Sequence, residues 1–340
     1  MEPETTVLST QLTRFCRSAL PWGGGGQVTG LTRLTDGWES EVYSFTVESA
    51  DGRERRDLIL RMFPGSVESD PAGKCAREYR ILEKLGRLGY PVPRVYAIDA
   101  GGSGLGRPSF VMEKINGPTA DALFLCSAPE ARRGLVTMFA ELLADLHALD
   151  ARHFEPEAPL FALSNLDAGW SGPLRGWTER FSQPGFGPVI DWLERRAVSV
   201  GRRPPALIHL DFHANNILMQ DGRPHVIDWT SAGLSDPRVD LAWTSLLMGG
   251  DEVWSLVRAD YERKAGYAIT DFDFFEVFAC LRRLFSVSVS LTHGADKLGM
   301  RPGAEANMRQ AMGQMGRIYQ LLLDRCGVAI PEVEAMLPRA

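Results

Sequence analysis

The first third of the chain alternates apolar and polar residues with the two-residue period of β-strands. Turn-forming stretches separate these segments, and Asp51-Gly52 is suited to the tip of a tight hairpin. Together they predict a small antiparallel sheet in this part of the chain. The predicted strands cover residues 28–35, 41–49, 56–63, 94–99 and 108–115.

A longer helix interrupts the strand pattern after residue 70. Asp70 is suited to cap its first turn and Pro71 to fill its first position, and an apolar stripe follows at helical spacing. A shorter helix is predicted at residues 6–20, before a glycine run at 23–26. Since no Lys-Ser or Lys-Thr pair follows these glycines, they predict a flexible joint and not a phosphate-binding loop.

Beyond about residue 117 the apolar residues recur every three or four positions, as in amphipathic helices. Within residues 129–150, Leu135, Met138, Leu142 and Leu146 fall on one face. The whole pattern predicts an α+β fold of two lobes. The first is a small antiparallel-sheet lobe with one well-marked helix, and the second is larger and mainly helical. Further helices are predicted at residues 187–200, 236–249, 250–266, 271–294 and 303–325.

Composition and charge argue against several classes of protein. The 340 residues carry a formal net charge of -6, so the chain lacks the basic balance of nucleic-acid-binding proteins. No apolar run approaches the roughly 18 residues of a membrane span, and the N-terminus lacks a signal-peptide core. The five cysteines are scattered without a CxxC pair, which disfavours a disulfide framework or a zinc ribbon. We therefore expect a cytoplasmic protein without nucleic-acid or membrane partners.

Residues 209–229 concentrate polar side chains around a short apolar hairpin. Two strands flank Asp221-Gly222, which is a strong two-residue turn signal. Asn216 enters the first strand and Asp228 leaves the second, so the hairpin is predicted to bring them together, with Asp211 in the preceding loop. An amide oxygen and a carboxylate suit Mg²⁺, and Asp211 remains to accept a proton from a hydroxyl group.

The motif "HLDxHxxN" at residues 209–216, followed by "IDW" at 227–229, resembles a known group of enzymes. This is the aminoglycoside phosphotransferase and choline kinase group of the protein-kinase-like superfamily. The resemblance implies a two-lobed kinase-like fold. Its nucleotide-binding lobe would span residues 1–115, and its catalytic and substrate-binding lobe residues 116–340.

The same resemblance implies roles for three residues of this segment. Asp211 would be the catalytic base that accepts the proton of the substrate hydroxyl. The other two catalytic residues, Asn216 and Asp228, would hold Mg²⁺ against the phosphates of ATP or GTP.

Further positions of the motif are structural in the group that the chain resembles. Asp236 and Asp240 would brace the catalytic loop. Two positions depart from the usual pattern, because the group generally has glycine where this chain has Leu210 and Ser235. Both lie beside the reacting groups, so they concern the backbone geometry more than the chemical roles.

The N-terminal half contains residues in the order that the resemblance requires. Arg61 takes the place of the usual lysine on a strand, and Glu78 in the capped helix would pair with it over the nucleotide phosphates. Backbone N–H groups from Gly37 to Ser40 would cover these phosphates. The contacts to the adenine base would come from Met112, Glu113 and Ile115.

Several functional alternatives stay open at this point. The acceptor is predicted to be a small-molecule hydroxyl compound, either an antibiotic of the aminoglycoside or macrolide type or a metabolite. A kinase-like nucleotide-binding protein with impaired catalysis is a second hypothesis, for which Arg61 argues. A third is a metal-dependent hydrolase built on His209, Asp211 and His213. We expect His209 to hold the backbone of the loop, and His213 to be either structural or a substrate contact.

Overall fold

The computed structural model describes residues 3–20, 22, 26–34, 40–49, 52–63, 70–154, 170–248, 251–298 and 312–337. The chain forms two compact units. The smaller one contains the N-terminal residues up to Pro118 together with Leu218–Thr230, and the larger one contains Thr119–Ile217 and the described residues from Ser231 onward. The predicted lobe boundary at residue 115 stays a prediction, and Leu218–Thr230 packs with the N-terminal residues.

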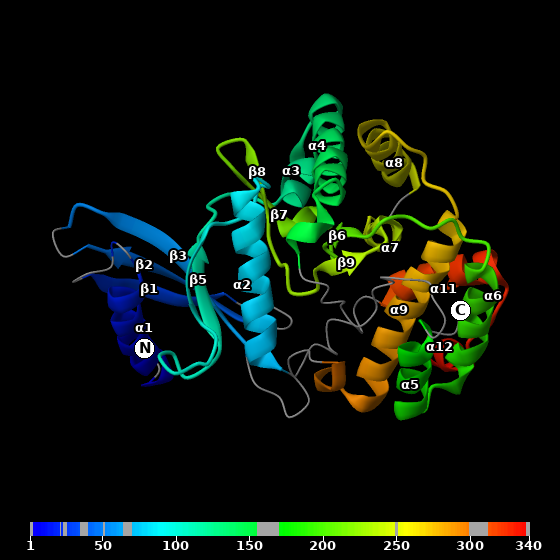
Figure 1. Ribbon diagram of the computed structural model, residues 1–340, viewed down its shortest axis with the longest axis horizontal. Coiled ribbons are helices and arrows are strands. Elements are labelled where there is room, and N and C mark those ends of the chain that lie inside the picture. Colours follow the sequence, from blue (N-terminus) through cyan, green and yellow to red (C-terminus); the bar gives the residue numbers. More distant parts are fainter. Residues whose placement is uncertain are drawn as a thin grey trace. The chain divides into compact units, whose positions relative to one another are not determined.

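The smaller unit is built on a five-stranded antiparallel sheet with the order β1-β2-β3-β5-β4 (Figure 1). All five strands occur where the alternating pattern predicts them. In the register of the central strand, Arg61 lies opposite Val42 on one neighbour and Phe110 on the other. The strands are β1 Gln27–Leu34, β2 Glu41–Glu48, β3 Arg55–Met62, β4 Val95–Asp99 and β5 Ser109–Glu113.

The two faces of this sheet are covered by different helices. Leu58, Leu60 and Met62 point to one face and join a buried cluster with α1 (Pro3–Ala19). Because side chains alternate along a strand, Ile59 and Arg61 point to the opposite face. That face is covered by α2 (Pro71–Arg87), which lies beside β5 in Figure 1. The alternation therefore aims Arg61 at the helix that carries Glu78.

The long helix α2 begins as predicted. The Asp70 carboxylate accepts the N–H of Gly73 at 2.9 Å, which satisfies a first-turn donor, and Pro71 follows at the first helical position. Tyr79 belongs to the apolar stripe of this helix, and its ring lies 6.0 Å from that of Phe110 on β5. The stripe fixes which helix face meets the sheet.

The predicted hairpin is present. Strands β7 (Ile217–Gln220) and β8 (Arg223–Val226) pair with each other, and both turn residues, Asp221 and Gly222, have positive φ angles of 52° and 73°. The hairpin packs closely on the segment that follows β5. A Cβ added to Gly117 would lie 1.8 Å from the Met219 carbonyl oxygen, so only glycine permits this approach.

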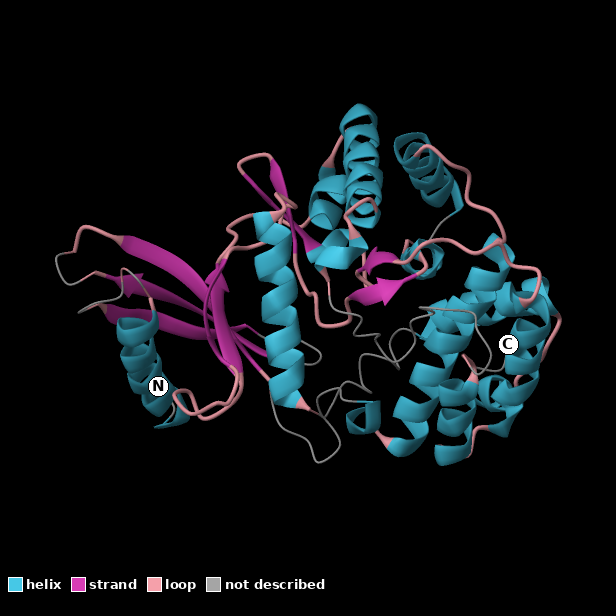
Figure 2. Ribbon diagram, in the orientation of Figure 1, coloured by secondary structure: helices cyan, strands magenta, loops and turns pink. Residues whose placement is uncertain are grey.

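The larger unit is mainly helical, with one two-stranded sheet (Figure 2). In that sheet β6 (Ala206–Ile208) pairs with β9 (Gly233–Ser235), so the buried Ser235 lies opposite Ala206. The helix predicted at 303–325 begins at Met312 within the described residues. The main helices are α3 Ala120–Cys126, α4 Pro129–His147, α5 Gly172–Arg180, α6 Gly187–Ala197, α7 Pro237–Leu247, α8 Asp251–Ala265, α9 Phe272–His293, α11 Met312–Cys326 and α12 Pro331–Met336.

Two expectations from composition concern the whole chain. All five cysteines are free thiols, and Cys16, Cys75 and Cys280 are buried. Among the residues that the structure describes, no helix has the length and apolar character needed to cross a membrane. The predicted cytoplasmic location stays a prediction.

Candidate functional site

The loop that follows β6 is held by a buried carboxylate. Asp240 on α7 accepts the main-chain N–H of His209 at 2.7 Å and that of Leu210 at 2.9 Å. Leu210 has a φ of +62°, the left-handed region in which glycine is usual. The bracing role predicted for Asp240 is confirmed, and the loop accommodates leucine where glycine is the usual residue.

His209 also holds the loop, as predicted. It is fully buried, and its Nδ1 accepts the main-chain N–H of Asp211 at 3.2 Å. Behind it, His147 Nε2 lies 3.3 Å from Asp240 Oδ2 and His147 Nδ1 lies 2.8 Å from the Tyr261 hydroxyl. The loop backbone is therefore tied to α4, α7 and α8 by polar contacts. This arrangement uses His209 as a structural residue.

Asp211 presents a partly exposed carboxylate surrounded by donors. Trp243 Nε1 donates to Asp211 Oδ1 at 3.3 Å, and His213 Nε2 lies 3.5 Å from Oδ2. Asn216 Nδ2 donates to the Asp211 carbonyl at 3.0 Å and to Oδ2 at 3.3 Å. The Asp211 side chain remains 40% exposed, so the carboxylate is fixed in place and still accessible.

The environment lowers the pKa of Asp211. Burial raises the pKa of this carboxyl, but the hydrogen bond and charge of His213 and the Trp243 hydrogen bond outweigh the burial. The net pKa lies well below the ordinary range for aspartate. Asp211 is therefore an ionised hydrogen-bond acceptor throughout the neutral pH range.

Arg282 on α9 contacts this loop, and the neighbouring Arg283 interacts electrostatically with Asp211. The sequence analysis predicted neither arginine. Arg282 lies over the Trp243 ring at 4.0 Å and donates to the Leu210 carbonyl at 3.4 Å. The Nε atom of Arg283 is buried without a hydrogen-bond partner in the described part of the chain, and the Asp211 charge stabilises this guanidinium. The bond from Arg282 to Leu210 joins residues 72 positions apart. The sequence carries no local signal for either arginine, nor for the bond from Trp243.

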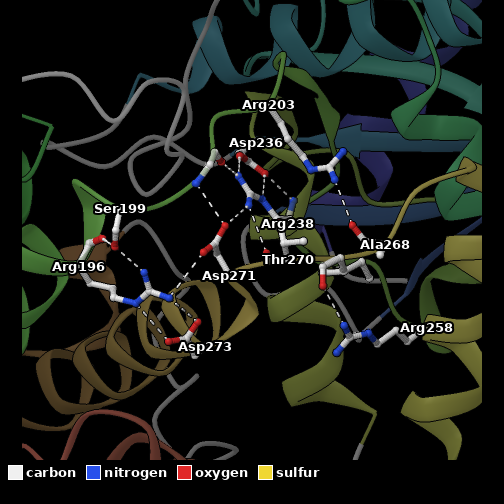
Figure 3. Close-up of polar contacts among 12 residues, drawn as sticks. Arg196, Ser199, Arg203, Asp236, Arg238, Arg258, Ala268, Thr270, Asp271 and Asp273 are labelled. Atoms are coloured by element: carbon white, nitrogen blue, oxygen red, sulfur yellow. Dashed lines mark hydrogen bonds and ion pairs between the residues drawn. The ribbon is translucent and has the colours of Figure 1, made fainter.

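The start of α7 is anchored by a buried arginine (Figure 3). Arg238 is fully buried, donates to Asp236 at 2.7 Å and 3.0 Å, and donates to the carbonyl groups of Gly201 and Thr270. It also lies 3.5 Å from Asp271, which precedes α9. Asp236 caps α7 by accepting the Arg238 N–H at 2.9 Å. The predicted structural role of Asp236 is confirmed, because the network fixes the helix that supplies Asp240 and Trp243.

In the smaller unit, four polar side chains meet beside α2. Arg61 on β3 is 7% exposed, and its Nε lies 3.1 Å from Glu78 Oε2. Its NH2 group donates to Asp228 Oδ1 at 2.6 Å and to Thr230 Oγ1 at 2.5 Å. The predicted pair of Arg61 with Glu78 is therefore present. The contacts to Asp228 and Thr230 were not predicted.

Burial governs the acidity of Glu78. Desolvation raises the pKa of this fully buried carboxyl to about 7, against the lowering effect of the Arg61 charge. The Asp228 charge raises it further, and hydrogen bonds from Thr230 and the Trp229 main chain lower it. Glu78 therefore titrates near neutral pH, which makes the pair with Arg61 sensitive to pH.

The other predicted nucleotide-binding residues lie in the smaller unit, and their role stays a prediction. Met112 and Glu113 end β5 partly buried, and Ile115 follows buried. The Glu113 N–H donates to the Arg94 carbonyl at 2.8 Å. Ser40 is buried directly before β2, and Gly37 lies outside the described residues.

The predicted metal ligands belong to different units, so their convergence stays a prediction. Asp228, in the smaller unit, has a φ of +65° and a side chain that is 44% exposed. Asn216, in the larger unit, uses its Nδ2 on Asp211, which directs its amide oxygen Oδ1 elsewhere. A carboxylate and an amide oxygen are hard donors, so both residues fit Mg²⁺ by their chemistry.

The sheet-based unit and the helical unit define a protein-kinase-like fold, as expected from the sequence. The sequence pattern of the phosphotransferase enzyme family matches residues 30–278. The chain belongs to this family.

Solved structures with low sequence identity share this fold. A choline/ethanolamine kinase family protein from Mesorhizobium loti is 19% identical with a TM-score of 0.62, over 96% of this chain and 99% of that one. A Ralstonia eutropha protein, provisionally assigned as an aminoglycoside phosphotransferase, is 18% identical with a TM-score of 0.69, over 94% and 98%. A mutant aminoglycoside phosphotransferase, APH(4)-Ia, complexed with ADP and hygromycin B, is 19% identical with a TM-score of 0.59, over 94% and 99%.

Curated relatives match a shorter part of the chain. Acyl-CoA dehydrogenase family member 10 of Mus musculus is 26% identical over 211 residues, which cover 56% of this chain and 18% of that protein. Acyl-CoA dehydrogenase family member 11 of Mus musculus is 28% identical over 206 residues, covering 55% and 25%. The chain thus spans a quarter or less of the length of these relatives.

Proposed function

We propose that this protein is a small-molecule kinase, which transfers the γ-phosphoryl group of ATP or GTP to a hydroxyl group. The observation that carries the proposal is the setting of Asp211. Its carboxylate is ionised and partly exposed, and Trp243, His213 and Asn216 hold it in place. Such a group orients an acceptor hydroxyl and takes its proton as the phosphoryl group arrives.

The smaller unit is the proposed nucleotide-binding lobe. Arg61 is always charged and presents a planar fork, which suits phosphate oxygens. Its ion pair with Glu78 supports this role, because the pair orients the guanidinium on a rigid strand. We assign Gly37 and Ser40 to the phosphates. Met112, Glu113 and Ile115 are assigned to the base, within a lobe of residues 1–115.

Asn216 and Asp228 are the proposed Mg²⁺ ligands. When bound, this ion would offset the negative charge of the nucleotide phosphates. The bonds from Asn216 Nδ2 to Asp211 give the proposal a physical basis, because they leave the amide oxygen for a cation. The carboxylate of Asp211 is then kept for the acceptor hydroxyl.

A coupled assay of ADP and GDP release, over a panel of hydroxyl compounds, tests the activity. Asp211→Asn should abolish turnover and largely preserve Mg-ATP binding measured by calorimetry. The matched control is Asp221→Asn at the exposed hairpin tip, where asparagine tolerates the positive φ of 52°. A near-normal kcat for Asp211→Asn would remove Asp211 as the base.

The metal site has its own test. Asp228→Ala should weaken Mg-nucleotide binding, measured by calorimetry at fixed magnesium concentration. Since Arg61 also donates to Asp228, the experiment is repeated with Thr230→Ala, which removes a different partner of the same arginine. Unchanged affinity in Asp228→Ala would exclude this carboxylate as a ligand.

The two rival hypotheses make different predictions. A nucleotide-binding protein with impaired catalysis would bind Mg-ATP and release no ADP with any acceptor of the panel. The hydrolase hypothesis requires His209 as a metal ligand, but this residue is buried and its Nδ1 accepts a loop N–H. Among the described residues, no group of three or more His, Cys, Asp or Glu side chains is arranged to hold a metal ion.

A further inference from the structure

A cavity of about 310 Å³ lies in the larger unit, beside the loop that carries Asp211. Helices α3, α4 and α8, the end of α7 and residues 213–215 form its walls. Most of its lining is apolar. The side chains that matter here are Phe124, Leu135, Phe139, Leu247, Met248 and Val253.

The cavity and the proposed base share a residue. His213 lines the cavity, and its Nε2 lies 3.5 Å from Asp211 Oδ2. Phe139 also lines the cavity, and its ring lies 4.9 Å from that of Phe212, the residue between Asp211 and His213 in the sequence. A molecule in the cavity would therefore contact His213, the neighbour of the carboxylate that is proposed to accept the hydroxyl proton.

The walls are preformed. Arg133 on α4 makes two hydrogen bonds to Asp260 on α8, of 2.5 Å and 2.8 Å, and Thr137 adds a third of 2.9 Å to the same carboxylate. The cap of α3 is joined to the loop, because Thr119 Oγ1 donates to Asn215 Oδ1 at 3.4 Å. Pre-organised walls lower the entropic cost of binding.

The chemistry of the walls defines a class of ligand. Phe124, Leu135 and Leu247 are only partly buried, so an apolar ligand would remove further apolar surface from water. Asp121 is the single carboxylate of the lining within the described residues. A polycationic acceptor needs several acids, so this cavity does not suit one.

We propose that the cavity binds the apolar part of the acceptor, a hydroxyl compound with an aliphatic or aryl group. The proposal rests on the proposed kinase function and specifies its substrate class. A cavity of about 150 Å³ holds one benzene ring, so this one accommodates about ten carbon atoms. The hydroxyl group of such a molecule would project toward Asp211.

A series of straight-chain primary alcohols, from ethanol to 1-octanol, tests the proposal. The kcat/KM for ADP release should rise about fourfold with each methylene added to the alcohol, because each buried CH₂ strengthens binding by a similar factor. Turnover that is independent of chain length would overturn the cavity assignment and leave the kinase function standing.

Variants that fill the cavity sharpen the test. Val253→Trp on α8 and Leu135→Trp on α4 should lower kcat/KM for 1-octanol at least tenfold and leave ethanol within about twofold. Val198→Trp is the matched control, since Val198 is 90% exposed and does not line the cavity. Equal losses for short and long alcohols in the cavity variants would contradict the proposal.

Calorimetric titration with 1-octanol separates the two proposals. If no hydroxyl compound of the panel supports ADP or GDP release, but 1-octanol binds to the unmodified protein and not to Val253→Trp, the cavity binds apolar molecules and the kinase function fails. If 1-octanol binds equally to Val253→Trp and to the unmodified protein, the cavity assignment fails. Both variants are checked by thermal unfolding, and Leu135→Trp replaces Val253→Trp if the latter does not fold.

Discussion

The main-chain N–H of Leu210 donates to Asp240 Oδ1 at 2.9 Å, and Leu210 adopts a φ of +62°. The left-handed region costs an L-residue roughly 1–2 kcal/mol, which glycine avoids. Leu210 is 1% exposed, so burial of its side chain contributes stability that a glycine would not supply. The Asp240 bond and this burial together stabilise the loop conformation that presents Asp211.

Replacement of Asp240 by asparagine tests this relationship. The two carboxylate oxygens accept the N–H groups of His209 and Leu210, and an amide offers only one oxygen. We expect the free energy of unfolding to fall by about 1–3 kcal/mol, because one buried N–H loses its acceptor. Turnover should fall as the loop relaxes. Both are measured by urea unfolding and by the coupled assay.

The control for this change is Asp145→Asn, which removes a charge from a half-exposed aspartate paired with Lys264. A surface change of this kind should alter stability by less than about 0.5 kcal/mol. Equal effects of the two substitutions would show that the loop does not depend on the Asp240 bonds.

The raised pKa of Glu78 predicts a dependence of stability on pH. Desolvation raises this pKa from 4.5 to about 7, so the folded state binds the proton more tightly than the unfolded state. This contribution to stability is fully present below pH 4.5 and is lost as the pH rises to 7. The loss is at most about 3 kcal/mol. Urea unfolding without nucleotide, at a series of pH values, measures it.

Glu78→Gln should flatten this part of the pH profile, since glutamine does not titrate. Glu83→Gln is the matched control on the same helix, at a side chain that is 38% exposed and pairs with Arg87. If Glu78→Gln and the unmodified protein lose stability in parallel between pH 4.5 and 7, Glu78 is not the titrating group.

Replacement of Arg283 is predicted to raise the stability of the protein and to lower its activity. Its Nε is buried with no hydrogen-bond partner in the described part of the chain, and burial lowers the pKa of the guanidinium. Arg283→Met should therefore raise the free energy of unfolding by about 1–3 kcal/mol. It should also reduce kcat about tenfold or more, because a positive charge near Asp211 would favour the developing charge of phosphoryl transfer.

Arg263→Met serves as the surface control for this prediction. Arg263 is 58% exposed and lies on α8, so its loss should change stability little. Chemical unfolding and the coupled assay give the two readings. A variant at residue 283 that loses both stability and activity would mean that the arginine is a structural residue.

Gly117 is predicted to be essential for docking of the hairpin. An alanine Cβ would meet the Met219 carbonyl oxygen at 1.8 Å, which forces the backbone apart. Overpacking of this kind costs about 1–3 kcal/mol. Gly134→Ala is the control, because an alanine methyl group there would have open space within 4 Å and alanine favours the helix. We expect Gly117→Ala to lower the melting temperature and Gly134→Ala to raise it. An unchanged melting temperature in Gly117→Ala would contradict the close approach of Gly117 to Met219.

Local signals in the sequence account for the elements and their order. The strands, the helix capped by Asp70 and the hairpin at Asp221-Gly222 lie where the patterns place them. Strand alternation also put Arg61 on the sheet face that α2 covers, where it pairs with Glu78. These features depend on contacts between residues that are near in the sequence, or on the spacing of apolar residues within a short segment.

Tertiary structure decided the surroundings of the site. The bond from Trp243 to Asp211 joins residues 32 positions apart, and Arg282 reaches Leu210 over 72 positions. The apolar cavity gathers side chains from four helices. The sequence by itself determined which polar side chains are the candidates for the chemistry, because it specifies residue type and local spacing. The packing of helices that are distant in the sequence decided which donors hold Asp211 and which side chains lie beside it. The local spacing of residues does not specify this packing.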